Sequence, residues 1–116
     1  MKYALLIHWN ESSAKDAPEG HVTDILEACD DHNRVMRDAG EWIKGAPLQP
    51  TSEAVSVRVR DGRALLSDGP FAETKEQLGG FTILDCESLE RAEDLAGEIL
   101  EAQRNYEGRI DLYEIG

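Results

Sequence analysis

The chain has 116 residues, of which 41% are hydrophobic, and 24 acidic residues against 12 basic ones give a formal net charge of −12. This length is typical of one domain that buries its core without disulfides or a structural metal, so residues 1–116 are interpreted as a single domain. The acidic excess argues against nucleic acid and anionic membranes as partners, because both require a basic surface.

Residues 2–9 are nearly all apolar, which is typical of a central strand covered on both faces. Because side chains alternate along a strand, one face carries Tyr3, Leu5, Ile7 and Trp9, and the other carries Ala4, Leu6 and His8. The apolar run is too short for a secretory signal of ~7–15 apolar residues, and no segment approaches the ~20 residues of a membrane helix.

The two cysteines, Cys29 and Cys86, lie far apart and have no Cys-x-x-Cys or Cys-His spacing. Without an export signal, the simplest interpretation is a cytoplasmic protein with two reduced thiols that pack as small apolar groups.

A helix is expected over residues 21–39, after a small, polar surface loop at 10–20. Its apolar residues recur at the spacing of one buried helix face, at positions 22, 25, 26, 29 and 36. Gly40 follows at the position where glycine commonly ends a helix. His32 lies at the edge of the apolar face and is interpreted as a partly buried structural histidine.

Four strands are expected next, at 41–45, 54–60, 63–67 and 80–86. The stretch 46–50 contains two prolines and must be irregular. Residues 54–60 alternate cleanly, and Asp61-Gly62 is a strong hairpin turn that leads into the returning strand.

Ser88 is expected to cap a second helix that runs to about residue 103, with Leu89, Ala92, Ala96 and Ile99 facing inward. Residues 109–115 form a closing strand. The order β-α-β-β-β-β-α-β predicts a two-layer α+β sandwich in which two helices cover one face of an antiparallel sheet.

The sheet carries more apolar side chains than one face can hold, and an exposed apolar face of that size usually becomes an interface. We therefore expect a homodimer through the sheet face. Most acidic residues fall in the two helical windows, 17 of the 24 lying at 11–41 and 85–107, so the charge is expected to coat the outer helices.

The segment from Asp68 to Phe81 packs a tight bend, an aromatic residue, alternating charges and a double glycine between two strands. Its Asp68-Gly69-Pro70-Phe71 start and Gly80-Phe81 end resemble the signature of the YCII-related family, in its DGPF-motif branch. The resemblance extends over essentially the whole chain, including the opening strand, Ala39-Gly40, Leu48-Gln49-Pro50 and Ser88-Leu89.

This resemblance implies a ferredoxin-like fold, a dimeric α/β-barrel assembly and a bacterial cytoplasmic protein. It also implies an association with extracytoplasmic-function sigma factors. Relatives in the YCII branch carry a His-Asp pair suspected of acid-base chemistry, with the histidine on the first helix. The matching position here falls near Cys29, so the resemblance does not supply that pair.

His8 and Asp68 are the candidate catalytic pair, because each ends a strand where clefts form and loops begin. A histidine with a carboxylate partner can act as a general base near neutral pH. The alternative is structural: His8 packs in the strand, and Asp68 caps its own turn. Candidate ligand-binding residues nearby are Trp9, Phe71, Glu73 and Lys75. No metal-ligand spacing and no cofactor motif is present.

Two classes of function remain open. One is an enzyme or binding protein that takes a small molecule in a cleft near the 68–81 segment. The other is a noncatalytic accessory or regulatory protein linked to a sigma factor, in which that segment is structural or contacts a partner.

Overall fold

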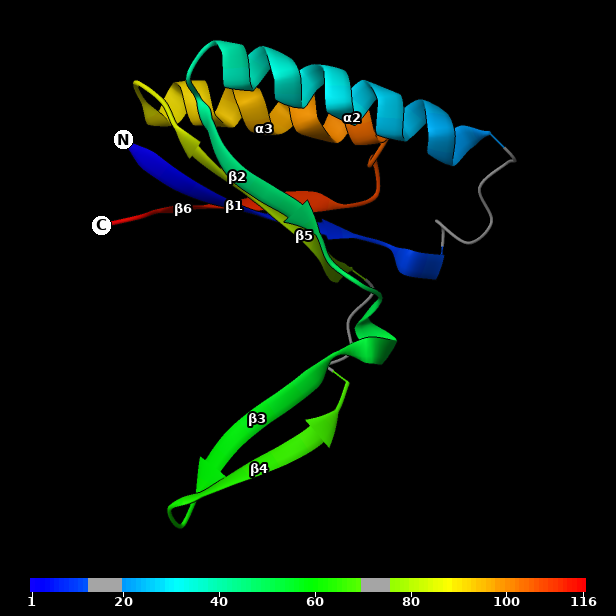
Figure 1. The fold of residues 1–116 in the computed structure, drawn as a ribbon, viewed down its shortest axis with the longest axis vertical. Helices are drawn as coiled ribbons and strands as arrows, with labels where there is room; N and C mark the ends of the chain where they lie inside the picture. Colours follow the sequence, from blue (N-terminus) through cyan, green and yellow to red (C-terminus); the bar gives the residue numbers. More distant parts are fainter. Residues whose placement is uncertain (13–19, 70–75) are drawn as a thin grey trace.

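The computed structural model describes residues 1–12, 20–69 and 76–116. Two helices lie over one sheet, and a separate hairpin projects away from both (Figure 1). In chain order the elements are β1 (Lys2–Trp9), α2 (His21–Asp38), β2 (Trp42–Pro47), the short 3₁₀ helix η1 (Thr51–Glu53), β3 (Val55–Arg60), β4 (Arg63–Asp68), β5 (Gln77–Asp85), α3 (Leu89–Gln103) and β6 (Arg109–Glu114).

The main sheet has four strands in the order β2-β5-β1-β6, and each neighbouring pair is antiparallel. With the β3–β4 hairpin set aside, the remaining order is β-α-β-β-α-β with both helices on one face. This arrangement confirms the α+β class and is consistent with a ferredoxin-like fold.

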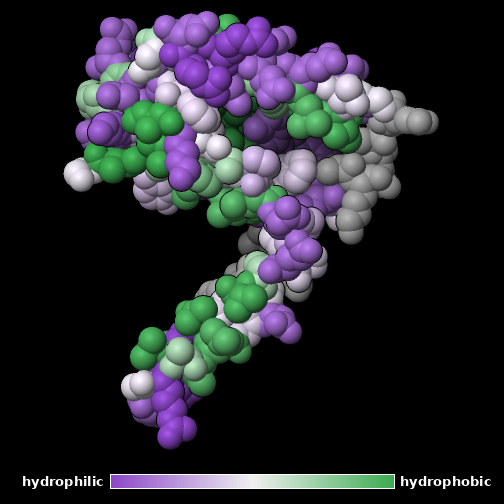
Figure 2. All heavy atoms as spheres, viewed as in Figure 1, coloured by the Kyte–Doolittle hydropathy of each residue, from purple (hydrophilic) through white to green (hydrophobic). Residues whose placement is uncertain are grey.

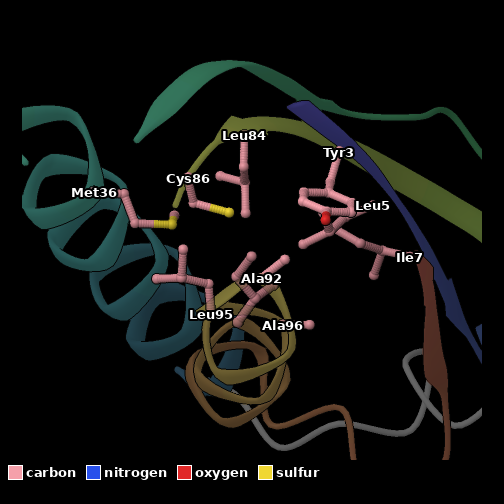
Figure 3. Packing of buried hydrophobic residues seen from close by; sticks show 10 residues of the cluster. Tyr3, Leu5, Ile7, Met36, Leu84, Cys86, Ala92, Leu95 and Ala96 are labelled. Carbon is pink, nitrogen blue, oxygen red and sulfur yellow. The ribbon is translucent and has the colours of Figure 1, made fainter. Parts of the chain in front are cut away.

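The core lies between the helices and the helix-facing side of the sheet (Figure 3). Its buried members are Tyr3, Leu5, Ile7, Met36, Leu84, Cys86, Ala92, Leu95, Ala96 and Ile99. Because the odd positions of β1 point into this core, its even positions lie on the opposite face of the sheet, which no helix covers. We call that opposite side the open face.

The two helices bury less of their predicted apolar faces than the spacing suggests. In α2, Met36 is buried, but Val22 and Leu26 are more than half exposed, because this helix packs mainly on α3 and the β2 margin. In α3, Leu95 is buried and Leu89 is exposed, which is the reverse of the prediction for Leu89.

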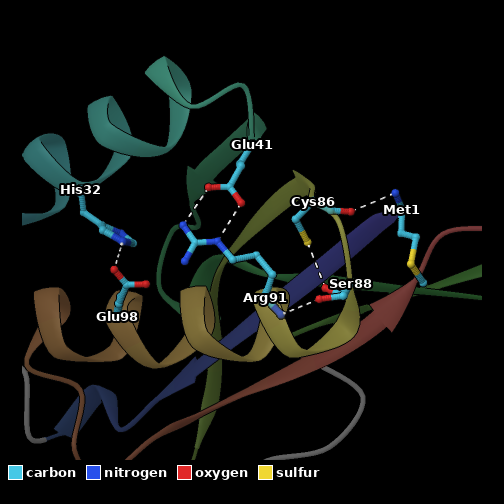
Figure 4. Close-up of polar contacts among 7 residues, drawn as sticks. All are labelled: Met1, His32, Glu41, Cys86, Ser88, Arg91 and Glu98. Carbon is cyan, nitrogen blue, oxygen red and sulfur yellow. Dashed lines mark hydrogen bonds and ion pairs between the residues drawn. The ribbon is translucent and has the colours of Figure 1, made fainter.

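Polar contacts fasten the helix layer to the sheet (Figure 4). Ser88 caps α3 as predicted, and its hydroxyl accepts a hydrogen bond from the Arg91 backbone N–H at 3.1 Å. The Arg91 guanidinium donates two hydrogen bonds of 2.9 Å to the Glu41 carboxylate, which lowers the pKa of Glu41. At the end of the sheet, the N-terminal ammonium donates to the Cys86 carbonyl at 3.0 Å.

The expectation of a single sheet is wrong, because β3 and β4 pair only with each other and form a second, two-stranded sheet. Pro47 ends β2, and Pro50 leads into η1, so the chain turns away before β3 begins. The hairpin projects on the side of the main sheet opposite the helices (Figure 1). The radius of gyration is consequently 15.9 Å, compared with about 13 Å for a compact domain of this length.

None of the helices in the described part of the chain is long and apolar enough to cross a bilayer.

Candidate functional site

His8 lies near the end of β1 on the open face of the sheet. Its Nε2 atom is 3.2 Å from Oδ2 of Asp111 on the neighbouring strand β6. That nitrogen is buried, yet among the described residues it has no partner with hydrogen-bond geometry, so the ion-pair contact is close but poorly aligned. The His8 side chain remains 16% exposed, which gives the ring limited access to solvent.

A chain of charged groups continues from Asp111. Arg109 donates through Nε to Oδ1 of Asp111 at 3.2 Å, and its Nη1 contacts the Glu76 carboxylate. The two acids raise the pKa of Arg109, with the hydrogen bond to Asp111 contributing most. Because Glu76 follows the 70–75 segment directly, the end of the predicted motif segment reaches His8 through Arg109 and Asp111.

The backbone around His8 is held by the loop that precedes β6. Asn105 Nδ2 donates a hydrogen bond of 2.8 Å to the His8 carbonyl. A Cβ at Gly108 would lie only 2.0 Å from the same oxygen, so glycine permits this close approach. On the other side, the β1–β5 register shifts between Ile7 and His8, and such a bulge redirects the side chains next to it.

Trp9, predicted to bind a ligand, packs across Gly79 of β5. A Cβ at Gly79 would lie 2.5 Å from the Trp9 Nε1 atom, which confirms the double glycine as a closely packed strand entry. The indole remains 40% exposed.

A hollow of about 320 Å³ lies at the base of the hairpin. It is lined by Leu48, Gln49, Pro50, Thr51, Glu53, Ala54 and Leu78. Leu78 is also the register partner of His8, so the hollow begins at the neighbouring strand, although His8 is not one of its lining residues. Glu11 fixes one wall, because its carboxylate accepts hydrogen bonds of 2.9 Å from both the backbone N–H and the hydroxyl of Thr51.

His8 and Asp68, the predicted catalytic pair, lie in different sheets. Asp68 is the last residue of β4, is exposed, and faces Val55 across the hairpin. Within the described residues, no hydrogen bond or ion pair joins it to His8, whose acidic neighbour is Asp111. The other predicted ligand-binding residues, Phe71, Glu73 and Lys75, lie outside the described residues.

Sequence reasoning missed Asp111, Arg109 and Glu76. The alternation of β6 places Arg109 and Asp111 on the face opposite the core residues Ile110 and Leu112, and this signal is present in the sequence. The pairing of β6 with β1 is what brings that face to His8, and one sequence does not specify which strands pair.

The contacts of His32, Cys29 and Cys86 are those of structural residues. His32 Nε2 lies 3.6 Å from Glu98 Oε1 between the two helices, which agrees with a structural histidine (Figure 4). Burial raises the pKa of both Cys29 and Cys86, which disfavours their reactive thiolate forms. The described residues contain no cluster of three or more histidine, cysteine or acidic side chains suited to a metal ion.

Comparison with known proteins tests the family resemblance of the sequence. A family model for the YCII-related domain matches residues 1–115. The chain is also 36% identical over 120 residues to an uncharacterized protein of Rhizobium meliloti (strain 1021), an alignment that covers 100% of this chain and 97% of the relative. The chain therefore belongs to the YCII-related family.

Proposed function

We propose that this protein binds a small molecule beside His8, and that the His8–Asp111 pair exchanges a proton with it. The observation that carries the proposal is the buried Nε2 of His8, which lies 3.2 Å from a carboxylate oxygen without an aligned hydrogen bond. A buried polar atom in this state is costly unless a further group completes its hydrogen bonding. A ligand at the rim of the open face would supply that group.

The neighbouring Arg109 holds the carboxylate of Asp111 in a fixed orientation. Arg109 holds one oxygen of Asp111, which leaves the other oxygen directed at His8. A histidine oriented by a carboxylate is the usual arrangement for general acid-base chemistry. In this proposal Asp111, rather than Asp68, is the acidic partner of His8.

The neighbouring hollow limits the size and polarity of the ligand. Its volume of about 320 Å³ is at the lower end of ligand sites, and Leu48, Pro50, Ala54 and Leu78 make much of its lining apolar. The ligand is therefore a small molecule with an apolar part and at least one polar group that reaches His8.

The proposal includes a homodimer formed through the open face. The apolar residues of that face are Ala4 and Leu6 of β1 and Phe81 and Ile83 of β5, which are register neighbours. A second copy would cover this apolar centre, while His8 lies toward the end of β1 and keeps access at the rim. We also place the chain in the DGPF branch of its family, on Asp68-Gly69-Pro70-Phe71, and in the cytoplasm, on its two free thiols.

The test is a screen of small metabolites by ligand-observed NMR with the intact protein. For any compound that binds, His8→Gln is expected to weaken affinity by about tenfold, since one hydrogen bond is worth about 1 kcal/mol. Asp111→Asn should have a similar effect through the orientation of the ring. His32→Gln is the matched control, because His32 also has a buried Nε2 near a carboxylate but lies between the helices.

Equal binding by wild type and His8→Gln would contradict the proposal. If no compound in the screen bound, the alternative of a noncatalytic accessory protein, associated with an extracytoplasmic-function sigma factor, would be favoured.

A further inference from the structure

We propose that the β3–β4 hairpin is an arm that packs its apolar face against the body of a second copy of this chain. The arm is residues 55–68, and the body is the four-stranded sheet with its two helices. This inference rests on the proposed homodimer and adds a second contact, made by a different part of the chain.

The strand register divides the arm into two chemically distinct faces. Cross-strand partners share a face, and the pairs Val55–Asp68, Val57–Leu66 and Val59–Ala64 alternate with Ser56–Ser67, Arg58–Leu65 and Arg60–Arg63. The first set forms the apolar face, made by Val55, Val57, Val59, Ala64 and Leu66, with Asp68 at its foot. The second set forms the basic face, which carries Arg58, Arg60 and Arg63 together with Leu65.

The apolar face is open in one copy of the chain. Val57 is 62% exposed, Leu66 is 72% exposed and Val59 is 77% exposed. Hydrophobic residues follow one another along the hairpin (Figure 2). A two-stranded hairpin alone in water is only marginally stable, so an apolar face of this kind calls for a surface to pack on.

Hydrogen bonds close the foot of the arm by joining the ends of its own two strands. Gly69 donates its backbone N–H to the Ala54 carbonyl at 2.6 Å, and the Ser56 hydroxyl donates to the Gly69 carbonyl at 2.9 Å. The arm projects on the open-face side of the sheet, and a wide notch separates it from the body (Figures 1 and 2). A second copy seated on the open face would lie beside the arm.

Charge selects the body of the second copy as the surface that the arm contacts. Residues 55–68 carry three arginines and two aspartates, a net charge of +1, while the rest of the chain carries −13. An arm is therefore attracted to a body, whereas a body repels nucleic acid and other anionic partners. The three arginines lie on the opposite face of the arm, where their charge adds to this attraction without entering the apolar contact.

The test compares matched glutamate substitutions on the two faces of the arm. Val57→Glu places a negative charge in the apolar face, and Ser67→Glu places the same charge on the basic face. Analytical ultracentrifugation of the full chain is expected to show a dimer dissociation constant raised at least about tenfold by Val57→Glu and changed less than about threefold by Ser67→Glu. Val59→Glu should repeat the effect of Val57→Glu, and circular dichroism confirms that each variant is folded.

Photo-crosslinking identifies the surface that the arm contacts. A photoreactive phenylalanine at position 59 is expected to link to a body residue of the second copy, as located by mass spectrometry. A crosslink to the second copy's arm would overturn the proposal.

The proposal is also overturned if Val57→Glu and Val59→Glu leave the dissociation constant unchanged. If Leu6→Glu still disrupted the dimer in that case, the arm contact would be rejected and the contact through the sheet face would be retained. A wild-type chain that is monomeric at all concentrations would reject both contacts.

Discussion

His8 and His32 make the same kind of local contact in different surroundings, and the surroundings decide which role each contact can have. Each ring has a buried Nε2 near a carboxylate, at 3.2 Å for Asp111 and 3.6 Å for Glu98. His32 lies between two helices, where the contact ties them together. His8 lies on an uncovered sheet face next to a hollow, where a third molecule has room to approach. The neighbouring elements, rather than the ion pair, distinguish a candidate site from a structural contact.

The Glu41–Arg91 pair leads to a prediction about stability and pH. Arg91 lowers the pKa of Glu41 below its ordinary value of 4.5, so the folded state favours the charged carboxylate. Its contribution is therefore complete above that value and is lost as the pH falls through the lowered pKa. We expect Glu41→Gln to reduce the free energy of unfolding by about 1 kcal/mol at pH 7, and the difference to vanish in acid.

Urea unfolding at several pH values measures this difference. Asp31→Asn is the control, because the Asp31–Arg34 pair is largely exposed and its loss should cost less than about 0.5 kcal/mol. A Glu41→Gln deficit that persists undiminished in acid would show that the side chain contributes through packing instead.

Among individual residues, the sequence located His8 and missed its partner. Strand alternation places His8 on the same face as Ala4 and Leu6, and this followed from residues 2–9 alone. Asp111 lies about a hundred residues further along the chain, and β6 also has a polar-apolar alternation that identifies its faces. The contact depends on β1 pairing with β6, a choice made by the whole sheet and not by either strand.

At the scale of elements, glycines at the β6 entry and within α3 make a contrasting pair. A Cβ at Gly108 would collide with the His8 carbonyl, whereas a Cβ at Gly97, inside α3, has nothing within 4 Å. We expect Gly108→Ala to destabilise the protein by about 1–3 kcal/mol, since the backbone must shift. Gly97→Ala should stabilise it by about 0.5–1 kcal/mol, because alanine favours the helix.

Thermal unfolding of the two alanine variants tests this contrast directly. An unchanged melting temperature for Gly108→Ala would mean that the β1–β6 end yields easily, and that His8 is held less firmly than its hydrogen bond from Asn105 indicates.

The elements themselves were largely predictable, because their signals are local. The Ser88 cap, the Asp61-Gly62 turn and the apolar run at 2–9 each depend on a few neighbouring residues. The exposure of Leu89 and Leu26, which the helical spacing placed on apolar faces, was not predictable in this way. Helical spacing defines an apolar face, but only the packing of α2 on α3 decides how much of that face is covered.

At the scale of the molecule, the proposed dimer predicts the behaviour of an open-face variant. Leu6 of β1 lies between Phe81 of β5 and Asp111 of β6 in the register, at the middle of the open face. A glutamate there would bury an unpaired charge in the interface, so Leu6→Glu should raise the dimer dissociation constant at least a hundredfold, about 2.7 kcal/mol.

Sedimentation equilibrium measures this change, and Val35→Glu is a suitable control on the exposed surface of α2. A Leu6→Glu protein that remained as dimeric as the wild type would place the interface elsewhere.

The overall α+β architecture followed from the order of elements, but the separate hairpin sheet did not. Val55, Val57 and Val59 alternate as they would in a half-buried strand of the main sheet. The alternation does not identify the surface that covers these valines. A strand that packs on another chain has the same alternation as a strand that packs on its own core.

The two-stranded arm has a further consequence for how the protein behaves before it meets a partner. Both of its edges lie outside the main sheet, and a valine-rich ribbon with open edges is a template for uncontrolled stacking and aggregation. Arg58, Arg60 and Arg63 line its other face, so two ribbons that pair edge to edge bring like charges side by side. The arginines therefore oppose the edge-to-edge pairing that would extend the ribbon into a larger sheet.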